Sequence, residues 1–343
     1  EIEEEWVTRP SRHLPFVPSR VLPRNVIMQE RSRLRPDGEL EHYLKPRVAM
    51  DSSDGASHSV NQGVPTYERT VALPTVQEHA RALAICEIAG RDAGTHAQQY
   101  AIDVTSAYRF CPLQRADWYT QIFLFWHEGV VGFCIDTRMG FGGSYAPNRF
   151  ERISRLGGAI IQRAQDRFDD ANPEPPAVQA WRHRRRDLQR RGLLPPFESQ
   201  TRPRHLQIFI DDYNGTALDD RVVTPARLLR MIVDPELTRA IGGVPAAHDT
   251  RVMVHALLAI EAITHLGLEA AAQKTLVGDP IVVLGLRVSR AAWRIDCPES
   301  KRGTLLAAMA EAKGEATATP PTADVRRAAT TVGRLCNLSQ IMP

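Results

Sequence analysis

Cysteine is scarce in this sequence, and its spacing excludes two classes of protein. Five cysteines occur in 343 residues, each standing alone, at Cys86, Cys111, Cys134, Cys297 and Cys336. They form neither the close pairs of a zinc site nor the framework of a disulfide-stapled secreted module. We therefore expect a reducing, intracellular location, either cytoplasmic or nuclear.

Long apolar runs are absent as well. No segment approaches the ~18 consecutive apolar residues of a membrane-spanning helix, so we expect no membrane partner. The first six residues, EIEEEW, are acidic and do not resemble a signal peptide. Because the chain lacks an initiator methionine, we expect it to be a fragment of a longer protein.

A strong net charge is missing too. The formal charge is +3, with 24% charged and 43% hydrophobic residues, which is typical of a globular protein long enough to bury a core. The basic residues are nevertheless clustered, since eight arginines and two acids stand between Trp181 and Arg204. Such a cluster suits phosphate backbones, although a solvated arginine-rich face is an equally ordinary explanation.

Strand-like and helical segments alternate along the chain. Proline and glycine delimit a helix over 74–91, a second helix begins near Ala146, and a third carries apolar residues from Met253 to Ile263 at helical spacing. Further helices are expected at 298–312 and 323–338. Runs rich in aromatic and β-branched residues predict strands at 99–104, 119–126, 130–136, 205–210 and 281–288.

The order of these segments favours one fold class. Alternating strands and helices, then a strand, an acidic turn, a long helix and another strand indicate an α+β fold with an antiparallel sheet backed by helices. Asn214 and Gly215 predict a turn after the strand at 205–210. The segment 169–204 is expected to be an insertion between core elements.

A short glycine motif raises a different fold, which the sequence excludes. Gly140 and Gly142 form a G-x-G after a strand, as at the start of a dinucleotide-binding fingerprint. Tyr145 stands where the third glycine of that fingerprint belongs. We therefore reject a doubly wound nucleotide-binding fold.

Three Asp-Asp pairs occur in different contexts. Asp169–Asp170 end an amphipathic helix and Asp219–Asp220 precede a polar stretch, so both pairs are interpreted as solvated acids or caps. Asp211–Asp212 instead follow the apolar strand LQIFI, where two like charges at a sheet edge repel each other. A bound cation would relieve that repulsion.

A third acid, Asp103, ends the strand-like run QYAID. Phosphoryl and nucleotidyl transfer require carboxylates that hold divalent ions, and strand ends aim such side chains rigidly. Asp103, Asp211 and Asp212 are therefore the candidate metal ligands. The alternatives are a cap or turn residue for Asp103 and exposed turn aspartates for the pair.

Six ordered motifs between about Lys45 and Leu338 resemble the reverse transcriptase superfamily, specifically retroelement polymerases. They are KPRVAMD at 45–51, YAIDVTSAYRFCPL at 100–113, MGFGGSYAPNRFERI at 139–153, FIDDYNG at 209–215, HLGLEAAAQKT at 265–275 and VVLGLRV at 282–288. The resemblance implies a right-hand polymerase with fingers and palm. It further implies a lead-in at 1–40, fingers and palm at 41–296 with the basic insertion 169–204, and a truncated start of the thumb at 297–343.

The resemblance also assigns roles at the chemical centre. It places Asp103, Asp211 and Asp212 on two Mg²⁺ ions, with Mn²⁺ as an alternative. Lys274 matches a lysine near the nucleotide's phosphates, a general acid toward pyrophosphate, and an exposed surface lysine is the alternative. Tyr108 matches the aromatic residue that excludes a ribose 2′-hydroxyl.

Other motif residues are implied to hold substrates. Lys45 and Arg47 match fingers residues that bind the incoming triphosphate. The turn of Phe141 and Gly142 is implied to lie under the nascent base pair. The residues implied to support the primer end are Leu284 and Gly285.

The expected function is therefore RNA-directed DNA polymerisation from dNTPs on a primed RNA or DNA template. A catalytically idle, retroelement-derived nucleic-acid-binding protein is the alternative. An RNA-dependent RNA polymerase is disfavoured because Tyr108 would block the 2′-hydroxyl. Arg184, Arg185 and Arg186 are expected to contact template or primer phosphates, and no oligomeric state is predicted.

Overall fold

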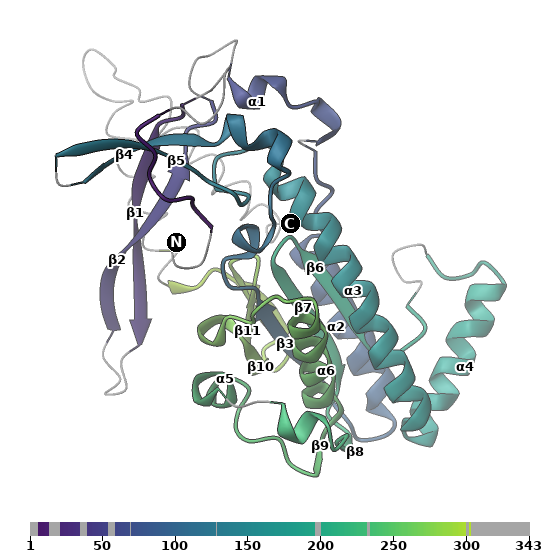
Figure 1. Cartoon of the computed structure of the whole chain (residues 1–343). Coiled ribbons are helices and arrows are strands. Elements are labelled where there is room, and N and C mark those ends of the chain that lie inside the picture. Colours follow the sequence, from purple (N-terminus) through teal and green to yellow (C-terminus); the bar gives the residue numbers. More distant parts are fainter. Residues whose placement is uncertain are drawn as a thin grey trace, which may run out of the picture. The chain divides into compact units, whose positions relative to one another are not determined.

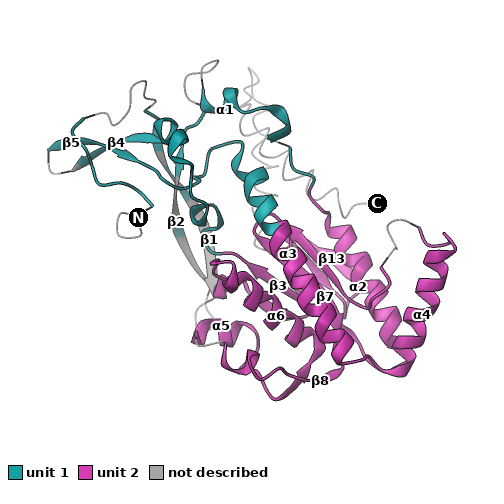
Figure 2. Ribbon diagram, turned by 45° about the vertical axis from the view of Figure 1, so that its right-hand side comes forward, with its two compact units in different colours: residues 1–72, 105–154 teal, residues 73–104, 155–343 magenta. Residues whose placement is uncertain are grey.

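The computed structural model describes residues 6–13, 21–34, 40–53, 59–68, 70–127, 129–195, 200–231, 234–299 and 302. The chain folds into two compact units, each built from two stretches of sequence (Figure 2). Unit 1 comprises Glu1–Ala72 and Thr105–Ser154, and unit 2 comprises Leu73–Val104 and Arg155–Pro343. Apart from 297–299 and 302, the predicted thumb segment 297–343 with its two helices lies outside the described residues.

Unit 1 contains two β-hairpins. β1 (Arg24–Leu34) pairs with β2 (Leu40–Met50), and β4 (Ile122–His127) pairs with β5 (Val130–Ile135), both antiparallel. β1 therefore lies inside the range expected as a lead-in, while the domain boundaries after residues 40 and 296 stay predictions. One buried apolar cluster of this unit consists of Val7, Leu22, Met50, Phe123 and Cys134.

Short helices connect the strands of unit 1. α1 (Val60–Gly63) is followed by a 3₁₀ turn at Thr66–Glu68, and two more 3₁₀ helices span Ala107–Phe110 and Arg115–Thr120. The last of these replaces the first residues of the strand predicted at 119–126, which begins only at Ile122.

Unit 2 is built on a four-stranded sheet in the order β10-β3-β7-β6. Its strands are β3 (Ala97–Asp103), β6 (His205–Phe209), β7 (Asp212–Leu218) and β10 (Leu276–Gly278). Every pairing in this sheet is antiparallel. The prediction of an antiparallel sheet in a mixed α and β fold is thus confirmed.

Helices cover both faces of this sheet (Figure 1). α2 (Val76–Arg91) begins with a capping box formed by Thr75 and Glu78, and the Cys86 sulfur lies 3.3 Å from Oγ1 of Thr216 on β7. α3 (Ala146–Ala171) and α6 (Arg251–His265) lie on the opposite face. Gln165 of α3 donates hydrogen bonds to the phenol oxygen of Tyr100 and to a backbone oxygen of α6. Tyr100 pairs with Gly215, the residue before Thr216, so Tyr100 and Thr216 lie on opposite faces of the sheet.

Two glycines allow the layers of unit 2 to approach closely. A Cβ on Gly215 of β7 would lie 2.0–2.3 Å from the ring carbons and phenol oxygen of Tyr100, and one on Gly158 of α3 would lie 1.9 Å from Ile208 Cδ1. Gly215 therefore serves packing inside a strand. The turn predicted at Asn214 and Gly215 was wrong, because the chain reverses at Ile210 and Asp211, and Asn214 and Gly215 are already paired with β6.

Unit 2 also contains a three-stranded sheet. β11 (Ile281–Val283), β12 (Leu286–Ser289) and β13 (Arg294–Asp296) form an antiparallel meander, so the strand predicted at 281–288 is a hairpin. Its apolar side packs on α2 and β3 in one buried cluster of Val76, Leu83, Cys86, Ala97, Ile281, Val283, Leu286 and Val288.

The segment expected as an insertion contains a helix, α4 (Pro176–Arg190), which starts with proline at its first turn. Trp181 of α4 packs against Ile85 and Ala89 of α2. Smaller elements complete unit 2, namely the pair β8 (Arg221–Val223) and β9 (His248–Thr250), and α5 (Pro235–Ala240). In the part of the chain that the structure describes, no helix is long and apolar enough to cross a bilayer.

Candidate active site

The end of the β3–β7 ladder brings two acids together. β3 ends at Asp103 and β7 begins at Asp212, and these residues are direct cross-strand partners. Asp103 is 6% exposed, and its side chain shares a hydrogen bond with that of Asp212. Two of the three acids predicted from sequence thus face each other at a strand end.

The third acid, Asp211, lies in the turn between β6 and β7. Phe209 pairs with Asp212, so Ile210 and Asp211 form a two-residue connection. Ile210 has φ of 56°, which is unfavourable for a β-branched residue. The Asp211 carbonyl accepts a hydrogen bond of 3.0 Å from the Val104 amide, which holds this turn beside the end of β3.

Burial and crowding perturb the acidic pair strongly. The pKa of Asp212 is raised to about 8 by burial, by its hydrogen bond with Asp103 and by the negative charges of Asp103 and Asp211. Without a divalent ion, Asp212 therefore keeps its proton in neutral solution. Like charges held together in this way favour a bound cation.

Lys274 is the cation that the structure places at this site. Its ammonium group forms an ion pair with Asp103 Oδ2, although the side chain remains half exposed. The preceding segment follows β3 closely, since the Ala271 amide donates to the Asp103 carbonyl at 2.7 Å and Ala270 forms a bridge with Val104. Lys274, predicted near a nucleotide's phosphates, thus lies against a predicted metal ligand.

The donor set fits a hard divalent cation, because Asp103, Asp211 and Asp212 supply only carboxylate oxygens. The geometry is not that of a finished metal site. Among the residues that the structure describes, no three His, Cys, Asp or Glu side chains are arranged to hold one ion. The structure brings Asp103 and Asp212 together and leaves Asp211 in the adjacent turn.

The aromatic residues predicted for nucleotide binding cluster within unit 1. The Tyr108 ring makes edge contacts with Phe141 and Phe150, at centroid distances of 5.2 and 5.7 Å. Gly142 has φ of 112°, and a Cβ there would lie 1.9 Å from the Met50 carbonyl oxygen. Glycine is therefore required by the backbone of β2 that the turn contacts.

Lys45 and Arg47 lie on β2, where their backbones pair with Gln29 and Ile27. Their side chains lie outside the part of the structure that is described. The prediction that they bind a triphosphate stays untested.

Leu284 and Gly285 form the two-residue turn between β11 and β12. Their φ values of 51° and 80° are both positive, which is the pattern of a type I′ hairpin. The structure thus places a tight hairpin turn at these two residues, and their support of a primer end stays a prediction.

The three arginines predicted to contact phosphates differ in their environments. Arg184 and Arg186 are exposed on α4. Arg185 is half-buried, with its guanidinium 5.5 Å from the Trp181 ring centre and its Nε donating to the Gln200 carbonyl. Arg184 and Arg186 are therefore better placed than Arg185 to meet a phosphate.

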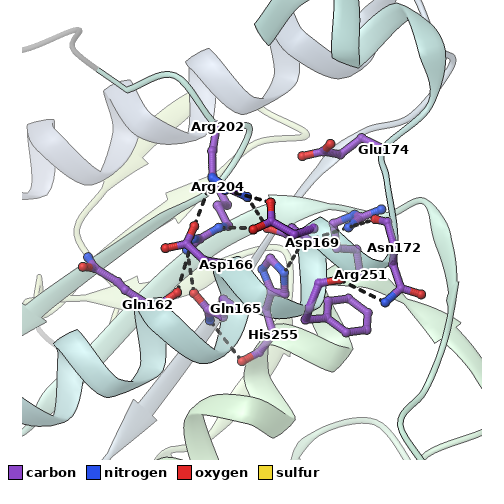
Figure 3. Close-up of polar contacts among 12 residues, drawn as sticks. Gln162, Gln165, Asp166, Asp169, Asn172, Glu174, Arg202, Arg204, Arg251 and His255 are labelled. Atoms are coloured by element: carbon purple, nitrogen blue, oxygen red, sulfur yellow. Dashed lines mark hydrogen bonds and ion pairs between the residues drawn. The ribbon is translucent and has the colours of Figure 1, made fainter. Parts of the chain in front are cut away.

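A buried ion network in unit 2 was missed by sequence analysis (Figure 3). Asp169 Oδ1 accepts from Arg251 Nη1 at 2.8 Å and from His255 Nε2 at 2.9 Å, and Asp169 Oδ2 lies 2.9 Å from Arg204 Nε. Arg251 also donates to both oxygens of Asp220. The interpretation of Asp169 and Asp220 as solvated acids or caps was wrong, since arginines distant in sequence pair with them.

These partners control the charge of Asp169, which is 2% exposed. Burial on its own raises the pKa of Asp169, but His255, Arg204 and Arg251 outweigh it and lower that pKa below its usual value. The carboxylate is therefore ionised inside the protein. Nothing in the local sequence signals this, because the partners stand 35 to 86 residues away.

Comparison with known proteins gives structural neighbours only. No family model and no curated protein matches the sequence. The chain is similar to the foamy viral protease-reverse transcriptase dRH in complex with double-stranded DNA, at 10% identity over 98% of this chain and 38% of that chain, with a TM-score of 0.44. It is also similar to the prototype foamy virus protease-reverse transcriptase, at 14% identity over 84% of this chain and 24% of that chain, with a TM-score of 0.36.

A third neighbour is the foamy viral protease-reverse transcriptase in complex with an RNA/DNA hybrid, at 11% identity over 92% of this chain and 27% of that chain, with a TM-score of 0.35. This chain spans less than half the length of each of these three proteins.

Proposed function

We propose that this chain is the fingers and palm part of a retroelement reverse transcriptase, an RNA-directed DNA polymerase. The observation that carries the proposal is the pair Asp103 and Asp212, opposed at the end of an antiparallel ladder with Asp211 in the adjoining turn. The order of the six sequence motifs supports the same assignment. Unit 2 is proposed as the palm and unit 1 as the fingers.

Asp103, Asp211 and Asp212 are proposed to hold two Mg²⁺ ions, with Mn²⁺ as a substitute. The raised pKa of Asp212 supports this, because burial and then the neighbouring carboxyl groups of Asp103 and Asp211 disfavour its negative charge. Divalent ions at such a site lower the pKa of a primer 3′-hydroxyl and neutralise charge on the transferred phosphate. Lys274 competes with a divalent ion for Asp103 Oδ2, and its half-exposed side chain is proposed to turn toward a phosphate.

Substrate contacts are proposed on unit 1 and on the β11–β12 turn. Tyr108, held by Phe141 and Phe150, is proposed to exclude the 2′-hydroxyl of a ribonucleotide. Lys45 and Arg47 are proposed to bind the triphosphate, and the turn at Gly142 to lie under the nascent base pair. Leu284 and Gly285 are proposed to support the primer end.

The exposed arginines of α4 are proposed to bind backbone phosphates of template or primer. Arg184 and Arg186 carry this proposal, because both side chains are exposed. Replacing both with alanine should weaken duplex binding and reduce its dependence on salt by about one to two counterions. An unchanged salt dependence of the dissociation constant would remove this contact from the proposal.

The direct test is primer extension on poly(rA) with an oligo(dT) primer, dTTP and Mg²⁺. The wild type should extend the primer, and Asp211→Asn should abolish extension while duplex binding persists. Asp92→Asn is the matched control, because Asp92 is an exposed acid of the same unit outside the acidic cluster. Extension by Asp211→Asn at the wild-type rate would refute the assignment.

One observation favours a second function. Since no three potential ligands are arranged for one ion among the described residues, a catalytically idle nucleic-acid-binding protein is the alternative. That function predicts tight duplex binding by the wild type, unaffected by Mg²⁺ or Mn²⁺, with no extension under either ion.

A further inference from the structure

One buried amide side chain, that of Gln99, ties the β11–β12 hairpin to the strand that carries Asp103. Gln99 lies on β3, four residues before Asp103, and is 0% exposed. Its Nε2 donates to Asp279 Oδ1 at 2.7 Å and to the backbone oxygen of Val288 on β12 at 3.2 Å. The central sheet and the hairpin therefore share a direct polar link.

Asp279 extends this link to the far end of the three-stranded sheet. It follows β10, whose last residue, Gly278, pairs with Gln99. Its carboxylate accepts the backbone amides of Arg290 at 2.6 Å and Ala291 at 2.9 Å, in the turn between β12 and β13. One carboxylate thus joins that turn to the edge of the four-stranded sheet.

His79 of α2 completes the network and fixes the orientation of the amide. Because Gln99 Nε2 faces a carboxylate and a carbonyl, Gln99 Oε1 must be the acceptor for His79 Nε2, 3.0 Å away. The proton of His79 therefore resides on Nε2. Burial lowers the pKa of His79 to about 4, so the ring stays neutral and keeps this arrangement at neutral pH.

Apolar side chains make up much of the remaining contact, and Arg290 in the β12–β13 turn adds an ion pair of 3.5 Å with Glu87 of α2. Ile281, Val283, Leu286 and Val288 pack on α2 and β3, and apolar burial is nondirectional. Hydrogen bonds inside a protein are directional and cost free energy when broken. The network of His79, Gln99 and Asp279 is therefore a directional part of this contact, and Gln99 makes it on β3 itself, where it can set the position of the hairpin along that strand.

We propose that Gln99 and Asp279 are positioning residues that set the Leu284–Gly285 turn relative to Asp103, and thereby place the primer 3′ end at the acidic cluster. Neither side chain touches the reacting atoms; both act through the hairpin. The proposal rests on the proposed polymerase function.

Two variants and a matched control test it. Asp279→Asn keeps the size of the side chain, but only one of its two polar atoms can accept the amides of Arg290 and Ala291. Gln99→Met removes the amide while keeping the length. Asp296→Asn is the control, because Asp296 belongs to the same small sheet and forms its ion pairs with Arg287 and Arg294.

The measurement is single-turnover extension of a preformed primer–template complex, together with the fluorescence of 2-aminopurine at the primer terminus in Ca²⁺. Both variants should lower the rate constant about tenfold, since a displacement of ~1 Å costs on the order of a hundredfold. Both should also change the fluorescence, with duplex affinity within about twofold of the wild type. A folding defect would instead lower the amplitude of the reaction and leave its rate constant unchanged.

Rate constants and fluorescence equal to those of Asp296→Asn would overturn the positioning role. A wild type that binds duplex without extending it would refute the polymerase function, and the fluorescence comparison would then still decide the positioning role. A wild type that binds no duplex would refute both.

Discussion

Asp212 is the residue whose charge the site perturbs most clearly. Its pKa is raised from 3.8 to about 8, so the folded protein binds this proton more tightly than the unfolded chain does. The resulting stabilisation is complete below the pKa of the unfolded chain and is lost as the pH rises through about 8.

This shift predicts a pH-dependent stability without metal ions. In EDTA, the free energy of unfolding of the wild type should fall between pH 5 and pH 8, relative to Asp212→Asn, by at most about 1.4 kcal/mol per pH unit. Chemical denaturation of both proteins across this range measures it. Parallel curves would show that Asp212 titrates normally.

The ion pair between Lys274 and Asp103 predicts that the lysine ammonium group and a divalent ion compete for the Asp103 carboxylate. Replacing it with methionine removes the cation paired with Asp103, so Mn²⁺ should bind about fivefold more tightly, equivalent to ~1 kcal/mol. Titration followed by electron paramagnetic resonance at pH 9, where proton competition is weak, measures this affinity. Gln273→Met, at the exposed neighbouring position, should leave it unchanged, and equal affinities for both variants would exclude the competition.

At the scale of elements, the close approach of β3 and β7 depends on Gly215. Alanine there would place Cβ 2.0–2.3 Å from the Tyr100 ring, which Gln165 holds through the phenol oxygen. Because an aromatic ring cannot yield locally, Gly215→Ala should destabilise the protein by about 1–3 kcal/mol. Gly63→Ala, with no heavy atom within 4 Å of its Cβ, is the control for thermal unfolding. Equal melting temperatures would contradict this account of the sheet.

The buried ion network should join α3, α6 and the connection between β7 and β8 energetically. Arg251→Met leaves Asp169 and Asp220 without their shared partner, so it should cost about 3–5 kcal/mol. Arg227→Met breaks an exposed pair with Glu261 on α6 and should cost at most ~1 kcal/mol. Urea unfolding of both variants gives the comparison, and similar losses would mean that the network adds nothing beyond a surface pair.

Local signals predicted those elements whose residues lie close together in the sequence. The helix expected at 74–91 is α2, because its capping box and apolar spacing are local features. The strand ending at Asp103 was predicted from its aromatic and β-branched residues. The turn was misplaced because the Asn-Gly signal was outweighed by the contact of Gly215 with Tyr100, more than a hundred residues away in the sequence.

At the scale of the whole molecule, the order of segments in the sequence predicted an antiparallel α+β fold but did not predict that the chain divides into two compact units. Each compact unit is assembled from two separated stretches, and no composition change marks Val104 or Ser154 as a crossing point. The candidate site was predicted in part: Asp103 and Asp212 meet as expected, while the pairing of Lys274 with Asp103 depends on a backbone path along β3 that periodicity does not reveal.

The measurement that tests the central claim most directly is incorporation of a single dTMP on poly(rA)·oligo(dT), compared between the wild type and Asp212→Asn at pH 8 in Mg²⁺. The account predicts incorporation by the wild type and a loss on the order of a thousandfold in the variant, because a displaced metal ligand removes several kcal/mol of transition-state stabilisation. Equal incorporation by both proteins would contradict the assignment of the reaction to the acidic end of β3 and β7.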